Sequence, residues 1–234
     1  MLQPGEKLLD IGCGWGGLAI WAARNYGVRV HGITLSSKQF SYGTERIKSL
    51  GLQNQITLEL RDYRELPQDM LFDKIVSVGM LEHIGVSNFP LYFATVQRLL
   101  KPGGLFLNHG ITNDTGWQAI ASARFINEYI FPDGELARIS DVTNVMEKQK
   151  FEILDVEALR PHYAMTLRHW MENLQSHKEK TIAIAGLRTY RLWRLYMAGS
   201  AYFFNQGNLG LYQILAGKNR HPWPVPLSRA HLYK

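Results

Sequence analysis

The most constraining stretch of the sequence is Leu8–Gly17, which reads LLDIGCGWGG. A short apolar run ends in an acid and is followed by four glycines. This pattern is typical of a buried parallel strand that turns tightly into a helix. Glycine permits the turn and lets the backbone approach a ligand at the N-terminus of that helix. The pattern therefore predicts a nucleotide-type binding site at the first strand–loop–helix unit.

The same glycines are compatible with two kinds of ligand. Gly12, Gly14 and Gly17 satisfy the GxGxxG spacing of dinucleotide-binding loops, in which a carboxylate about 20 residues further on binds a ribose. Here Asp10 lies at the strand end, and the next strand end, Val30–Ser36, carries no acid. At ~4 Å a carboxylate repels a pyrophosphate by a few kcal/mol, but it attracts an ammonium group. The loop therefore favours S-adenosylmethionine, which carries an amino-acid moiety, over NAD.

The rest of the chain alternates predicted strands and helices. A length of 234 residues with 46% hydrophobic content predicts one α/β domain over residues 1–234. Ser36 and Gln39 resemble a capping box that opens a helix to about Ser49, and a second helix is expected over Pro90–Leu100. After the first strand, six more are expected, at Val28–Ile33, Ile56–Leu60, Phe72–Val78, Leu105–Asn108, Phe151–Ala158 and Leu209–Leu215. This alternation predicts a doubly wound, mostly parallel seven-stranded sheet of the Rossmann-like kind, with ligands at the carboxyl ends of the strands.

Two segments interrupt or follow this alternation. A helical insertion is expected at about 112–150, after the fifth strand, and a basic helical segment at about 160–200. From Arg160 to the end, the chain holds eleven Lys or Arg and two acids, whereas the net charge of the whole chain is +6. A solvated basic face explains this equally well as a basic amphipathic helix that binds an anionic surface. Such a surface is phospholipid or nucleic acid, and composition does not choose between them.

Composition also bounds the cellular setting. Cys13 is the single cysteine, which excludes an internal disulfide and a multi-cysteine zinc site and indicates a reduced, cytosolic protein. No stretch reaches the ~18 uninterrupted apolar residues of a membrane-spanning helix, and no signal peptide is visible. Because Met1 lies only a few residues before the first strand, an upstream part is expected to be absent from this chain.

Five motifs carry a family resemblance over nearly the whole chain. In order, DIGCGWGGLA, GITLSSKQ, RDYREL, FDKIVSVGMLEHIG and YIFPDGEL resemble the cyclopropane-fatty-acyl-phospholipid synthases. This resemblance implies a class I methyltransferase fold, an S-adenosylmethionine cofactor and an acyl-lipid substrate at an anionic membrane surface. It further implies a lipid-facing insertion, no nucleic-acid partner and a peripheral location on the inner membrane face, and it is compatible with a homodimer.

The resemblance assigns the cofactor-binding residues. Asp10, Gly12 and Gly14 would hold the methionine part, Thr34 and Gln39 the ribose side, and Asp62 and Tyr63 the adenine. A carboxylate can accept from the exocyclic amine while an aromatic ring covers the adenine face. Structural alternatives stay open, since Thr34 could simply cap a strand end and Tyr63 could simply cover the core.

The resemblance also assigns the chemistry. An alkene attacks the sulfonium methyl, and the resulting carbocation loses a proton to a bound bicarbonate. Glu82, His109 and Tyr163 match the family's bicarbonate ligands. His83, His162 and His169 are expected to be pocket-covering, surface or packing residues, and no metal site is predicted.

Two departures from the family pattern limit this assignment. The family places a further bicarbonate-contacting cysteine and a lid segment upstream of the first strand, whereas this sequence begins at Met1, only a few residues before that strand. Where the family usually reads His-Thr-Ile, this chain reads His109-Gly110-Ile111, and the glycine is expected to widen the pocket or free the backbone. Three hypotheses therefore remain: a lipid-modifying enzyme that cyclopropanates or methylates an acyl chain, a methyltransferase of a soluble amine, and a cofactor-binding module that needs an upstream part or a partner.

Overall fold

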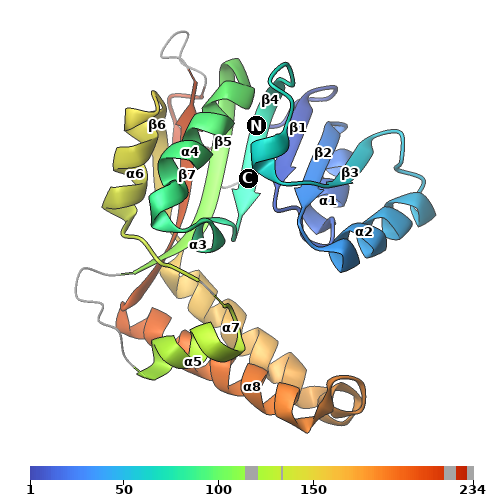
Figure 1. The fold of residues 1–234 in the computed structure, drawn as a ribbon, viewed down its shortest axis with the longest axis vertical. Coiled ribbons are helices and arrows are strands. Elements are labelled where there is room, and N and C mark those ends of the chain that lie inside the picture. Colours follow the sequence, from blue (N-terminus) through green and yellow to red (C-terminus); the bar gives the residue numbers. More distant parts are fainter. Residues whose placement is uncertain (114–120, 133, 219–224, 231–234) are drawn as a thin grey trace.

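A computed structural model describes residues 1–113, 121–132, 134–218 and 225–230 and shows a seven-stranded sheet with the order β3-β2-β1-β4-β5-β7-β6 (Figure 1). Strand β7 pairs antiparallel with both neighbours, and the other pairings are parallel. The strands are β1 (Lys7–Ile11), β2 (Arg29–Thr34), β3 (Ile56–Leu60), β4 (Phe72–Val78), β5 (Leu100–Asn113), β6 (Glu152–Ala158) and β7 (Leu209–Gly217). The doubly wound, mostly parallel fold is confirmed.

Helices cover the sheet and extend beyond its carboxyl edge. They are α1 (Gly17–Tyr26), α2 (Ser37–Ser49), α3 (Leu81–Ile84), α4 (Phe89–Leu99), α5 (Ala121–Tyr129), α6 (Ile139–Lys148), α7 (Arg160–Ser176) and α8 (Lys178–Gln206), with short 3₁₀ turns η1 (Tyr63–Glu65) and η2 (Val86–Asn88). Strands β3 and β4 have the predicted bounds. Strand β5 is longer than the predicted Leu105–Asn108 because β7 pairs with it from Leu105 to Asn113, a contact that local sequence does not encode.

Two hydrophobic clusters lie on the two faces of the sheet. One face carries an aromatic core in which α4 supplies the fully buried Phe89, Tyr92 and Phe93 and β5 supplies Phe106. The other face packs against α1 through Ala19, Ala22 and Ala23, whose small side chains let the helix approach closely. Both faces thus hold the strands in register, so that their carboxyl ends form one edge.

The predicted insertion at about 112–150 divides into two parts with different partners. Helix α6 belongs to the sheet domain, because Val142 and Met146 are fully buried in the aromatic core. Helix α5 instead lies against the α7–α8 hairpin (Figure 1). Its Phe125 and Ile126 pack against a third cluster that includes Leu167 and Phe204.

The α7–α8 hairpin extends away from the carboxyl edge of the sheet (Figure 1). Helix α8 is interrupted at Gly186, whose φ of 83° lies in the region that favours glycine. Within the described residues, no helix is long and apolar enough to cross a membrane.

Candidate functional site

The glycine loop after β1 surrounds a buried carboxylate. Asp10 is 2% exposed, its Oδ2 atom makes no hydrogen bond within the described residues, and burial raises the pKa of its carboxyl to about 7. Gly12 and Gly14 have φ values of 77° and 55°. A Cβ at Gly12 would lie 3.3 Å from Met80 Sδ, whereas a Cβ at Gly14 would meet nothing within 4 Å. A buried carboxylate beside open space fits the ammonium group of S-adenosylmethionine.

Thr34 and Gln39 form a hydrogen-bonded pair at the end of β2. The Thr34 hydroxyl donates to Gln39 Oε1 at 2.7 Å and accepts from the Ser36 amide at 3.2 Å. The Ser36 side chain accepts from the Gln39 amide at 3.3 Å, as a helix cap does. The bond from the Gln39 amide to the Ser36 side chain, one half of the predicted capping box, is therefore present. In the other half, the Ser36 amide donates to the Thr34 hydroxyl instead of to the Gln39 side chain. The pair lies at the same edge as Asp10, with the Thr34 hydroxyl committed to internal bonds.

Asp62 and Tyr63 follow β3 at this edge, and the structure gives them different surroundings. The Asp62 carboxylate forms an ion pair with Arg64 at 2.6 Å, and this hydrogen bond lowers its pKa. Tyr63 is 8% exposed and packs edge-on against Tyr92 at a ring separation of 5.2 Å. Asp62 therefore stays ionised at the rim, whereas Tyr63 belongs to the core, the alternative that the sequence left open.

Glu82 lies on the short helix α3, directly after β4. Its Oε1 atom accepts from the Ile111 amide at 2.7 Å, while Oε2 is buried without a partner in the described chain. Burial raises the pKa of this carboxyl. Helix α3 lies close to β5, since a Cβ at Gly110 would be 3.0 Å from Leu81 Cβ. The expectation that Gly110 widens the pocket is therefore wrong: its missing side chain makes room for α3.

Two tyrosines from the helical hairpin lie near Glu82. Burial raises the pKa of Tyr163, on α7, to about 12, with smaller contributions from Tyr196 and Glu82. The pKa of Tyr196, on α8, is also raised, chiefly by burial and further by Glu82. Both phenols therefore stay protonated and can donate hydrogen bonds in a largely dry setting.

His109 follows on β5, in register with Val78 of β4. Burial lowers the pKa of its ring, and its backbone carbonyl accepts from the Gly79 amide at 2.9 Å. Among the described residues, no hydrogen bond joins the His109 ring to Glu82 or Tyr163. The structure thus places Tyr163 within electrostatic reach of Glu82, and it places His109 on β5, the strand next to β4.

Sequence reasoning missed two members of this group. Tyr196 lies within the segment that the sequence predicted as basic and helical, and it is only 9% exposed. The Ile111 amide gives no signal in a side-chain pattern, because it is a backbone group.

The three other histidines named in the sequence analysis are not part of this group. His83 packs against the Phe131 ring at 5.6 Å, and His162 and His169 are exposed. In the part of the chain that the structure describes, no cluster of three or more His, Cys, Asp or Glu residues could hold a metal ion.

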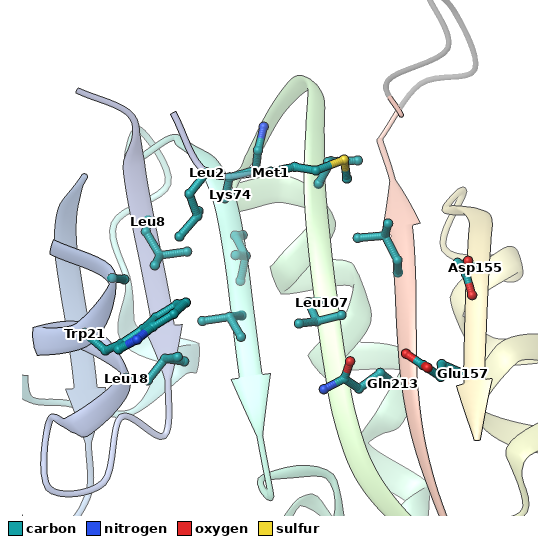
Figure 2. Close-up of a pocket in the computed structure, with 15 residues that line it drawn as sticks. Met1, Leu2, Leu8, Leu18, Trp21, Lys74, Leu107, Asp155, Glu157 and Gln213 are labelled. Carbon is teal, nitrogen blue, oxygen red and sulfur yellow. The ribbon is translucent and has the colours of Figure 1, made fainter. Parts of the chain in front are cut away.

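A separate apolar groove lies on the sheet face that carries α1 (Figure 2). It has a volume of about 280 Å³ and is lined mostly by aliphatic side chains, together with Met1, Trp21 and the polar Lys74, Asp155, Glu157 and Gln213. None of the predicted site residues lines it. The carboxyl edge therefore remains the candidate site, because the unpartnered carboxylates of Asp10 and Glu82 are both found there.

The sheet order, the buried acid at the end of β1, the glycine loop after it and the second buried acid after β4 are those of the class I S-adenosylmethionine-dependent methyltransferase fold. The mycobacterial cyclopropane synthase MmaA2 from Mycobacterium tuberculosis has the same fold, with a TM-score of 0.87 at 33% identity over 93% of this chain and 79% of its own. The mycolic acid cyclopropane synthase CmaA1, solved with SAH and CTAB, gives 0.86 at 33% identity over the same shares.

The family is equally defined. Residues 1–214 match the mycolic acid cyclopropane synthetase family, and the chain belongs to it. It is 48% identical over 240 residues to a "Probable fatty acid methyltransferase" of Pseudomonas putida, a match that covers 100% of this chain and 60% of that protein. The cyclopropane-fatty-acyl-phospholipid synthase of Escherichia coli is 37% identical over 92% of this chain and 54% of its own length. The chain thus spans little more than half the length of these curated relatives.

Proposed function

We propose that this chain is the catalytic domain of an S-adenosylmethionine-dependent enzyme that adds one carbon to the double bond of an unsaturated acyl chain in a phospholipid. The observation that carries the proposal is Glu82, a buried carboxylate with one oxygen held by the Ile111 amide and the other unpartnered. Two buried phenols, Tyr163 and Tyr196, stay protonated and lie within electrostatic reach of it. This arrangement suits the removal of a proton away from water.

S-adenosylmethionine supplies an electrophilic methyl group when bound. Asp10 would hold its ammonium, and Thr34, Gln39 and Asp62 would hold its ribose and adenine. Gly12 and Gly14 keep the loop backbone free of side chains beside Asp10, where a Cβ at Gly14 would meet only open space. Tyr63 contributes by supporting the Asp62 turn from the core rather than by covering the adenine.

Bicarbonate is the base that the family resemblance implies, and it would accept the proton that the substrate loses. Glu82, Tyr163 and His109 are the residues that would hold it. A carboxyl whose pKa is raised by burial can share a proton with a small anion, and a protonated phenol can donate to it. The donor set on this edge therefore fits such a group.

The names of the relatives support an acyl substrate but two different products. The E. coli relative is named for cyclopropane formation, and the P. putida relative for methylation of a fatty acid. Loss of a proton from the transferred methyl closes the ring, whereas loss of a proton from the neighbouring acyl carbon leaves a methyl branch on a new double bond. We favour ring closure, and the methyl branch is the second candidate.

The hairpin supports a membrane location for the substrate. Lys178, Lys180 and Arg188 are exposed around its tip, and Ile184 beside them is 77% exposed. Basic residues flanking exposed apolar side chains suit an anionic bilayer. The protein would thus be peripheral at the cytoplasmic face of the inner membrane, without a nucleic-acid partner.

Product analysis with deuterated methyl groups tests the proposal. The full-length protein is incubated with phospholipid that carries a cis double bond and with cofactor whose methyl carries three deuterons. A cyclopropane retains two of these deuterons and a methyl branch retains all three, so mass spectrometry separates the products. Label on a soluble amine and never on lipid carbon would overturn the proposal in favour of an amine methyltransferase.

A Glu82→Gln variant tests the role of the carboxylate in the same assay. It keeps the shape but loses the charge, so turnover should fall at least tenfold while cofactor affinity stays nearly constant. Removal of bicarbonate should slow the native enzyme as well. Unchanged turnover under both conditions would assign Glu82 to the shared fold rather than to catalysis. Loss of activity that returns only when an upstream segment is added would identify this chain as a module.

A further inference from the structure

A second set of buried polar groups lies behind Glu82, between the sheet and α4. Ser77, Tyr92 and Asn108 are each no more than 1% exposed. The hydroxyls of Ser77 and Tyr92, both amide atoms of Asn108 and Oε2 of Glu82 make no well-formed hydrogen bond among the described residues. Five polar atoms in one interior region are unusual, because buried polar groups are nearly always satisfied.

The backbone brings these side chains to one face of the sheet. Ser77 on β4 and Asn108 on β5 are partners in the parallel register, so both point to the face covered by α4. The Ser77 hydroxyl is close enough to Tyr92 to lower the pKa of that phenol, although burial raises it more. Ser77 thus links Tyr92 on the helix with Asn108 on the next strand.

Glu82 lies next to these three side chains, on the side nearest the carboxyl edge of the sheet. Helix α3 packs over Gly110, which lies two residues beyond Asn108 on the same face of β5. The Glu82 carboxylate also contributes to the raised pKa of Tyr92, which places the two side chains within electrostatic reach. Tyr92 carries an O–H donor and Asn108 an N–H donor, and Glu82 Oε2 is the acceptor without a partner.

We propose that Ser77, Tyr92 and Asn108 form a water-bridged network that donates to Glu82 Oε2 and so fixes the position and charge of this carboxylate. Buried water typically makes about three hydrogen bonds to polar groups of this kind. The Ile111 amide holds one oxygen of Glu82, and the network holds the other. Tyr92 and Asn108 are positioning residues, since they act through Glu82.

The network has a defined effect on the ionisation of Glu82. Donors to a carboxylate favour its charged form, so their removal raises its pKa. Replacing Tyr92 by Phe changes no other charge, because the phenols around Glu82 stay protonated over the working range. Besides Tyr92, the titratable groups near Glu82 are Tyr163 on α7, Tyr196 on α8 and the adjacent His83, whose pKa is lowered by burial. The amide of Glu135 donates to the Glu82 carbonyl, and the Glu135 carboxylate accepts from the Val86 amide. His109 lies on β5, the strand whose Ile111 amide donates to Glu82.

NMR titration of the Glu82 carboxyl tests the network directly. The protein is labelled with ¹³C at glutamate carboxyls, and Glu82→Gln identifies the signal. We expect Tyr92→Phe and Asn108→Leu each to raise the pKa of Glu82 by about one pH unit, a tenfold change in its ionisation constant. Asn108→Ser, which restores a hydroxyl, should reverse part of that shift. Tyr190→Phe, at a buried tyrosine on α8, is the matched control and should leave the signal unchanged.

This inference rests on the proposed function only for the importance of Glu82, and the titration separates the two. An unchanged Glu82 titration in folded Tyr92→Phe and Asn108→Leu would overturn the network, whatever the activity. A shifted titration in a protein that never labels lipid would uphold the network and refute the proposed function. If the network and the proposed function are both correct, the acid limb of the pH profile of turnover should move to higher pH in the variants, together with the pKa of Glu82. Unfolding by urea checks that the variants remain folded.

Discussion

Asp10 links the stability of the fold to pH with a predictable sign. Burial raises the pKa of its carboxyl from 3.8 to about 7. Between these two values the unfolded chain has lost a proton that the folded chain still holds. The free energy of unfolding must therefore fall as the pH rises across this interval, and the whole penalty is present above it.

The size of the effect follows from the same two values. At 1.36 kcal/mol for each pH unit, the buried charge costs about 4 kcal/mol at pH 8. An Asp10→Asn variant keeps the shape of the side chain and removes the charge. Relative to the native chain, we expect its free energy of unfolding to gain little at pH 4 and up to ~4 kcal/mol at pH 8.

Urea unfolding followed by tryptophan fluorescence at several pH values between 4 and 8 measures this difference. Asp73→Asn is the matched control, because Asp73 binds the Lys101 ammonium at 2.7 Å and the Lys7 amide at 2.8 Å, and its pKa is lowered. That variant should lose stability by a nearly constant amount above pH 5. Parallel pH curves for native protein and Asp10→Asn would refute the assignment of Asp10 as a buried, penalised charge.

Cofactor binding should carry the opposite pH dependence through the same residue. A bound ammonium favours the ionised carboxylate, so S-adenosylmethionine should bind more tightly as the pH rises from 6 to 8 and should release a proton below pH 7. Calorimetry in buffers of different ionisation enthalpy detects that proton. The chain should bind S-adenosylmethionine and its demethylated product but not NAD, and tight binding of NAD would contradict the site.

Three further predictions follow from the packing and the charge. Gly12→Val should abolish cofactor binding in calorimetry, because its φ of 77° and its 3.3 Å approach to Met80 would force the loop out of shape, and urea unfolding checks that the variant is still folded. Gly110→Ala should lower the free energy of unfolding by ~1–3 kcal/mol, because its Cβ would press on Leu81, whereas Gly199→Ala, which meets nothing within 4 Å, should not. Vesicle sedimentation should show binding that rises with anionic lipid and falls with salt, and equal binding to neutral vesicles, or stronger competition by duplex DNA, would exclude the membrane surface.

Features with a local cause could be predicted from the sequence. Strands β3 and β4 have the expected bounds, because each is a short apolar run between turn residues. The loop after β1 follows from its glycines, and the start of α2 follows from Ser36, whose side chain accepts from the Gln39 amide. Asp10 could be singled out because it is an acid at the end of a strand that leads into the glycine loop, and its role in cofactor binding stays a prediction.

Features that depend on distant segments could not be predicted. Strand β5 continues to Asn113 because β7 pairs with it, about a hundred residues further along the chain. The LEHIG motif identifies Glu82, but its partner is the backbone amide of Ile111, which no side-chain pattern reveals. Tyr196 has the same difficulty, since a tyrosine on a basic helix faces inward only because α8 folds back along α7.

Gly110 shows why a departure from a family pattern needs the packing around it. By sequence, a glycine beside His109 suggests a wider pocket, because a side chain is missing. In the structure, Leu81 occupies that space, and a Cβ at Gly110 would approach Leu81 Cβ to 3.0 Å. The glycine therefore leaves room for α3 to pack against β5, and Glu82 on α3 accepts from the Ile111 amide at 2.7 Å. The space of the missing side chain is thus filled by Leu81 of this chain.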